Sequence, residues 1–125
     1  MKALRVPIFV VLAMLSGAVS LSAHHSWPVS TSRLVTVKGT VIEFAWENPH
    51  PVITLEVRTD EGELETWLVG GPAINRMAAN GWTKTTVKPG DMLTGIGYQF
   101  ADGQKIVRLE RVVMPDGKEL RLYGR

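Results

Sequence analysis

The sequence predicts a small all-β domain, an OB-like β-barrel of about five to six strands with one short helix. Short runs of alternating apolar and polar residues are separated by Gly, Pro and Asp turns, which is typical of antiparallel strands. A single segment with helical spacing falls between the third and fourth runs. A long first strand that changes phase near Gly39 completes the strand order of an OB barrel. Other small β-barrels and sandwiches share much of this pattern.

The first predicted strand covers residues 34–46. Its apolar residues fall into two alternating sets, Val35, Val37 and Val41 in the first and Ile42, Phe44 and Trp46 in the second. Strict alternation cannot place both sets on one face of a sheet, so we expect a bulge or sharp bend between Gly39 and Val41.

The next two runs predict a hairpin. Residues 52–58 and 63–69 alternate apolar and polar side chains, and Asp60-Glu61-Gly62 supplies the turn between them. A short helix of about two turns should then begin near Pro72 and end at Asn80-Gly81, because proline favours a first turn and glycine a left-handed stop.

Three more strands are expected in the last third of the chain. Residues 92–100 contain Gly95 and Gly97, which would allow tight coiling or the close approach of another backbone. Residues 106–114 and 119–123 follow, each after a turn that contains glycine.

Residues 1–23 have the features of a secretory signal. Lys2 and Arg5 precede an apolar run, and a stretch of small residues leads to Ala23. A membrane anchor is the alternative, but the apolar run is shorter than the ~20 residues that a spanning helix needs. We therefore expect Sec-type export to the periplasm or the medium, with no integral membrane segment left after cleavage.

Cleavage would leave 102 of the 125 residues, which is enough for one domain. Residues 24–33 contain Pro28 and no apolar periodicity, so they should form an extended N-terminal arm. Residues 34–125 should form the single domain.

Charge and cysteine content exclude several classes of function. Loss of Lys2 and Arg5 lowers the 14 basic residues to 12, equal to the 12 acidic ones, and no basic cluster suggests nucleic acid as a partner. The chain has no cysteine, so it can have no disulfide, no lipid attached to an N-terminal thiol and no thiol catalysis.

The three histidines form the strongest candidate site. His24 and His25 lie beside the predicted cleavage point, and imidazole and a free N-terminal amine are both good copper ligands. Cleavage after Ala23 would let His24 offer its amine and ring, whereas cleavage after Ser22 would place a histidine third, where a planar Cu(II) or Ni(II) site can form. With His50 as a further nitrogen, we predict a copper site, with zinc or nickel less favoured and no organic cofactor.

Simpler interpretations compete with this metal site. The adjacent His24 and His25 could form a solvated tail, and His50 could only hydrogen-bond within its turn, because no established spacing motif links the three. Glu47 lies three residues before His50 and could orient its ring as a second-shell partner, but an exposed carboxylate is often merely solvated.

Little in the sequence indicates an enzyme. There is no Gly-x-Ser-x-Gly motif, and Gly70-Gly71 is followed by Pro72, which lacks the backbone donor that a phosphate-binding loop needs. The tryptophans could stack on sugars or bases. A domain of this size needs such residues in its core, where we place Trp46 and Trp82, leaving Trp67 open.

Several short motifs resemble those of a family of exported bacterial proteins that is catalogued only as a domain of unknown function. The motifs are Ala23-His24-His25-Ser26, Gly39-Thr40-Val41, Trp46-Glu47-Asn48-Pro49-His50, Gly81-Trp82-Thr83, Lys88-Pro89-Gly90-Asp91 and Asp116-Gly117. The resemblance implies an exported single-domain β-barrel and no established activity. Members often carry an acidic residue shortly after the position of Trp67, where this chain has Leu68, Val69 and Gly70, so a family site that used this carboxylate would be weaker here.

Two hypotheses of different class follow. The first is a non-enzymatic metal-binding protein that uses His24, His25 and His50, with Glu47 in the second shell. The second is an accessory module that binds another exported protein through its barrel face or an edge strand, with incidental histidines.

Overall fold

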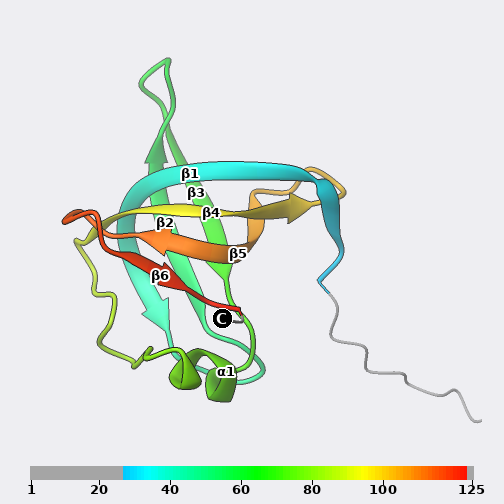
Figure 1. The fold of residues 1–125 in the computed structure, drawn as a ribbon. Coiled ribbons are helices and arrows are strands. Elements are labelled where there is room, and N and C mark those ends of the chain that lie inside the picture. The colour runs from blue at the N-terminus through cyan, green and yellow to red at the C-terminus, as the bar shows by residue number, and fades with distance from the viewer. Residues whose placement is uncertain (1–26, 124–125) are drawn as a thin grey trace, which may run out of the picture.

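In the computed structural model, residues 27–123 are described, and they form one six-stranded sheet and one short helix (Figure 1). The elements in chain order are β1 (Val29–Ala45), β2 (Val52–Arg58), β3 (Leu64–Gly70), α1 (Ile74–Ala79), β4 (Met92–Phe100), β5 (Ile106–Val113) and β6 (Glu119–Arg121).

The long strand β1 joins the two halves of the sheet. Its first part pairs with β4 and its last part with β2, both antiparallel, and the register with β2 shifts between Val41 and Glu43. At Gly39 a Cβ atom would lie 2.5 Å from the carbonyl oxygen of Glu56, so only glycine allows the strands to approach this closely. The irregularity expected near Gly39 to Val41 is therefore present in β1.

A parallel pairing brings the two ends of the strand series together. β3 pairs with β5 at Leu68↔Ile106, Val69↔Val107 and Gly70↔Arg108. Five strands form a near-ring, because the pairings return to the starting strand: β1–β2, β2–β3, β3–β5, β5–β4 and β4–β1. The sixth strand, β6, pairs with β5 outside this near-ring. The predicted all-β class with one short helix is confirmed, as is the position of the helix between the third and fourth strands.

Two strand ends differ from the expectations. β1 begins at Val29, where it pairs with Phe100, so part of the predicted arm is extended chain within the sheet. β6 ends at Arg121, because Leu122 turns into the core and its backbone N–H donates to the carbonyl of Glu110 at 3.1 Å.

The core fills the interior of the near-ring. Its fully buried apolar residues are Val37, Val41, Ile53, Leu55, Val69, Met77, Trp82, Val87, Leu93, Val107, Leu109, Val112 and Leu122. No polar or charged residue within 27–123 is buried. Because there is no disulfide, burial of these side chains is the main stabilising contribution.

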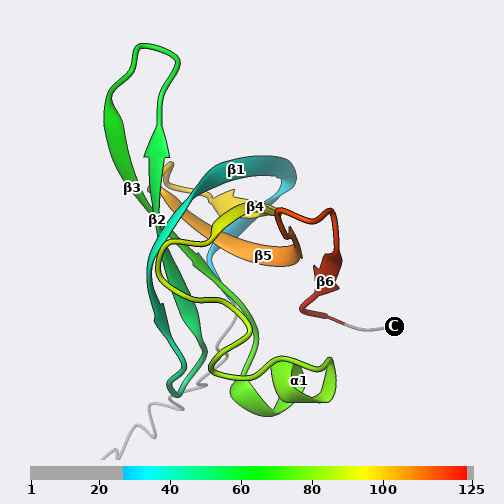
Figure 2. The same ribbon diagram turned by 90° about the vertical axis from the view of Figure 1, so that its left-hand side faces the viewer.

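The helix covers one end of the near-ring, opposite the tip of the β2–β3 hairpin (Figure 2). Met77 points from α1 into the core beside Trp82, whose indole N–H donates to the carbonyl of Arg121 at 3.0 Å. Trp82 is buried as expected, whereas Trp46 and Trp67 are partly buried and pack against the core. Within residues 27–123 no helix is long and apolar enough to cross a bilayer.

The β2–β3 hairpin offers a matched pair of substitutions for the core. Leu55 is 0% exposed and Leu64 is 55% exposed. We expect Leu55→Ala to lower the free energy of unfolding by about 3 kcal/mol, because it removes buried methyl groups and leaves a cavity. Leu64→Ala should change it by less than about 0.5 kcal/mol. Urea denaturation of both variants measures this, and equal losses would contradict the described core.

Candidate functional site

Trp27, two residues before the start of β1, lies against the end of β3. A Cβ atom on Gly70 would lie 2.5 Å from Cη2 of the Trp27 indole, so the indole packs on bare backbone that no other residue could offer. The carbonyls of Trp27 and Pro28 accept hydrogen bonds from the backbone N–H groups of Val29 and Ala101, at 2.8 and 2.9 Å. These contacts hold the start of the described chain beside the sheet.

His50 lies in the turn between β1 and β2, directly after the cis Asn48–Pro49 peptide bond. Its ring centroid is 4.3 Å from that of Trp27, with 41° between the ring planes. The Nδ1 atom of His50 is buried. Phe100, at the end of β4, meets the other edge of Trp27 at 5.7 Å, nearly perpendicular. Segments far apart in sequence thus converge on Trp27.

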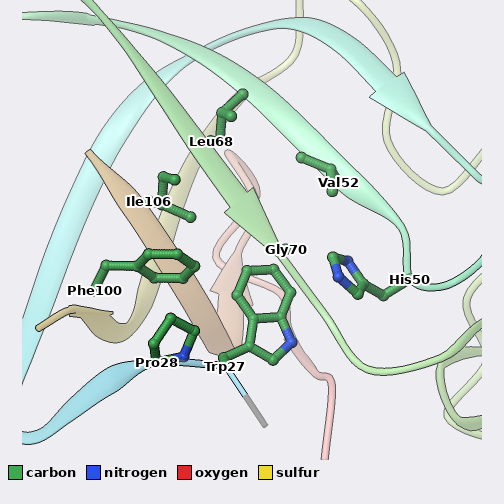
Figure 3. Close-up of a pocket in the computed structure, with 8 residues that line it drawn as sticks. All are labelled: Trp27, Pro28, His50, Val52, Leu68, Gly70, Phe100 and Ile106. Atoms are coloured by element: carbon green, nitrogen blue, oxygen red, sulfur yellow. The ribbon is translucent and has the colours of Figure 1, made fainter. Parts of the chain in front are cut away.

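A cavity of about 330 Å³ opens beside these rings, and we call it the apolar cavity (Figure 3). Its lining residues are Trp27, Pro28, His50, Val52, Leu68, Gly70, Phe100 and Ile106. His50 is the only titratable side chain among them. Leu68 and Gly70 line the cavity while Val69 is buried in the core, so the positions after Trp67 bring no carboxylate to it.

A second cavity, also of about 330 Å³, shares Trp27 and His50 with the first, and we call it the arginine cavity. Its lining residues are Trp27, Pro49, His50, Pro72, Ala73, Arg76, Arg108 and Tyr123. Among residues 27–123, two arginines and no carboxylate line this cavity, so the described lining favours negative charge.

The phenol of Tyr123 stays protonated in this environment. Burial of the ring raises the pKa of Tyr123 above its usual value of 10.0, and the carboxylate of Glu110 raises it further. The positive charges of Arg108 and Arg76 act in the opposite direction but do not cancel the effect of burial. The hydroxyl is therefore a hydrogen-bond donor at neutral pH.

Of the four predicted site residues, the structure describes His50 and Glu47, and these two differ in position. His50 lines both cavities, whereas Glu47 is exposed and lines neither. His24 and His25 lie outside the described residues. Within residues 27–123 no three His, Asp or Glu side chains are grouped to hold a metal ion.

Sequence reasoning did not assign a role to Trp27, Arg76, Arg108 or Tyr123 at the site. For Trp27, the available signal is its position between the histidine pair and Pro28. The two arginines give no such signal, because each stands alone in an ordinary helix or strand pattern and they meet only in the folded chain.

Comparison with protein families gives one match. Residues 12–108 match the family described as "Family of unknown function (DUF6152)", which covers most of the chain and both segments that bring Trp27 and His50 together. No match was found among curated proteins.

The contact between Trp27 and Gly70 can be tested with a double-mutant cycle. Gly70→Ala should lower the free energy of unfolding by about 1–3 kcal/mol, because the new methyl group must displace the indole. In a Trp27→Ala background, Gly70→Ala should change the free energy of unfolding little. The coupling energy between the two positions should therefore be similar to the loss caused by Gly70→Ala alone. Thermal denaturation of the four proteins measures it, and additive effects would show that the indole does not pack there.

The raised pKa of Tyr123 predicts a loss of stability at high pH. The phenol of Tyr123 ionises near pH 10 in the unfolded chain and at higher pH in the folded protein. Its contribution to the free energy of unfolding is therefore complete below pH 10 and is lost as the pH rises above 10. Absorbance titration of Tyr98→Phe, which leaves one of the two tyrosines, assigns the pKa. The free energy of unfolding of the parent protein should fall as the pH rises above 10. Tyr123→Phe should remove the share of this fall that Tyr123 causes.

Proposed function

Because this chain belongs to the family of unknown function DUF6152, we propose its function from the site itself: an exported, non-enzymatic protein that binds copper through His24, His25 and His50. The observation that carries the proposal is the contact between the rings of Trp27 and His50, 4.3 Å apart.

This contact supports the proposal because Trp27, which touches His50, follows the other two histidines closely in sequence. His25 is two residues and His24 three residues before Trp27. An extended chain spans at most about 3.6 Å per residue, so their Cα atoms stay within roughly 7 and 11 Å of that of Trp27. A tether of this length raises the effective concentration of both imidazoles near His50.

The ligand chemistry favours copper. Three imidazole nitrogens and a new N-terminal amine form a nitrogen-rich set, and nitrogen donors bind Cu(II) more strongly than the other common divalent metals of the first row. Zinc and nickel are weaker candidates for the same ligands. Glu47 is the proposed second-shell partner, three residues before His50 in the same turn segment.

Calorimetry with Cu(II) on protein purified after export tests this proposal. We expect micromolar or tighter binding, weakened at least about tenfold by His24→Ala and by His50→Ala, because each removes one nitrogen ligand. Trp27→Leu keeps every ligand but removes the ring contact, so it should weaken binding by a smaller factor. Millimolar or absent binding by the parent protein would refute the proposal.

The pH dependence gives a second readout of the same site. Only neutral imidazole binds the metal, so affinity should fall as the pH drops below about 6.5. Intact mass of the exported protein, with and without copper, reports both the cleavage point and the retained metal. A mass that includes residues 1–23 would contradict cleavage of the signal.

The apolar cavity favours a second candidate, an accessory module that binds another exported protein. Leu68 is 39% exposed at its edge, so an apolar side chain of a partner could enter. In that case a pull-down should recover one partner equally well after chelation and after His24→Ala or His50→Ala. Strict dependence on metal would count against this candidate.

A further inference from the structure

The arginine cavity combines two positive charges from different elements. Arg76 comes from α1 and Arg108 from β5, and Tyr123 follows β6. The parallel pairing Gly70↔Arg108 places Arg108 beside the strand end on which Trp27 packs. The lining of the cavity therefore combines cationic and aromatic side chains.

Arg108 is held in a defined orientation. Its guanidinium carbon lies 5.4 Å from the ring centroid of Tyr98 and 5.5 Å from that of Tyr123, and Nη2 donates to Oε1 of Glu110 at 2.8 Å. Its Nε atom is buried and has no hydrogen-bond acceptor among residues 27–123. A guanidinium that is already ordered loses little conformational entropy when it binds an anion.

Arg76 supplies charge that no carboxylate within residues 27–123 neutralises. Its side chain is exposed and forms no ion pair within the described part of the chain, whereas Glu110 pairs with Arg108. Arg76, Arg108 and Tyr123 all line the arginine cavity, so one ligand bound there can face all three groups. The protonated hydroxyl of Tyr123 adds a neutral hydrogen-bond donor to the two cationic ones.

The remaining lining selects the rest of the ligand. Trp27, Pro49 and Pro72 present flat or rigid apolar surfaces, and about 330 Å³ is within the range of small-molecule sites. Inorganic phosphate would leave these surfaces uncovered. A small molecule with a planar apolar body and one carboxylate fits both parts of this lining. Its apolar body can pack on the rings, and guanidinium groups bind carboxylates with matching geometry.

We propose that the arginine cavity binds a small organic carboxylate, with the carboxylate held by Arg76, Arg108 and the Tyr123 hydroxyl and the planar body against Trp27. The proposal goes beyond copper binding and does not rest on it, since neither the arginines nor the phenol is a proposed metal ligand.

NMR titration of metal-free, chelator-treated protein with benzoate tests the proposal. We expect saturable shifts of the backbone amides of Ala73, Arg76, Arg108 and Tyr123, with a Kd near or below about 1 mM. Benzamide has the same shape without the charge, and inorganic phosphate has charge without the ring. Both should bind at least about tenfold more weakly than benzoate.

Charge-removing variants locate the site. Arg76→Gln and Arg108→Gln should each weaken benzoate binding about tenfold, the effect of losing one charge-assisted hydrogen bond. Arg33→Gln is the matched control, because Arg33 is exposed on β1 and lines neither cavity, and it should bind like the parent. Arg76 makes no ion pair with any other described residue, so Arg76→Gln decides the test even if Arg108→Gln does not fold.

Four results would overturn the proposal. They are no saturable shift up to about 10 mM benzoate, equal affinity for benzamide, equal affinity for phosphate, or unchanged benzoate binding in Arg76→Gln. None of these results bears on copper binding, which is measured separately.

Discussion

The packing of the Trp27 indole on the bare backbone of Gly70 is the contact on which the candidate site depends. It brings the start of the described chain to the end of β3 and sets the indole beside His50 and Phe100. Because any side chain at residue 70 would occupy the space of the indole, the absence of a Cβ atom there is a requirement of the site. Both cavities take Trp27 as part of their lining.

The bent strand β1 makes this contact possible. By pairing with β4 along its first part and with β2 along its last, it allows the strand series to return on itself, so that β3 meets β5. That last pairing sets Gly70 opposite Arg108. The packing site of the indole and the Arg108 guanidinium are therefore neighbours for the same topological reason.

The two proposed activities use different chemistry at one place. Copper binding would use neutral imidazole, and His50 is the ligand that the described residues supply. Carboxylate binding would use the guanidinium groups and the phenol of the arginine cavity, which shares Trp27 and His50 with the apolar cavity. Among the residues that the structure describes, Arg76 has no carboxylate partner, whereas Arg108 pairs with Glu110, so the two arginines are not equivalent. Arg76 adds a second positive charge to the cavity, and Arg108 holds its guanidinium in a fixed orientation.

The sequence by itself determined the β class, the β2–β3 hairpin, the short helix with its stop at Gly81 and the irregularity in β1. These features depend on alternation and turn chemistry among near neighbours, which a single chain displays directly. Only the tertiary structure decided that Trp27 packs on Gly70 and that Arg76, Arg108 and Tyr123 share a cavity. These contacts join residues that are far apart along the chain, and closure of the near-ring, not any local pattern, brings them together.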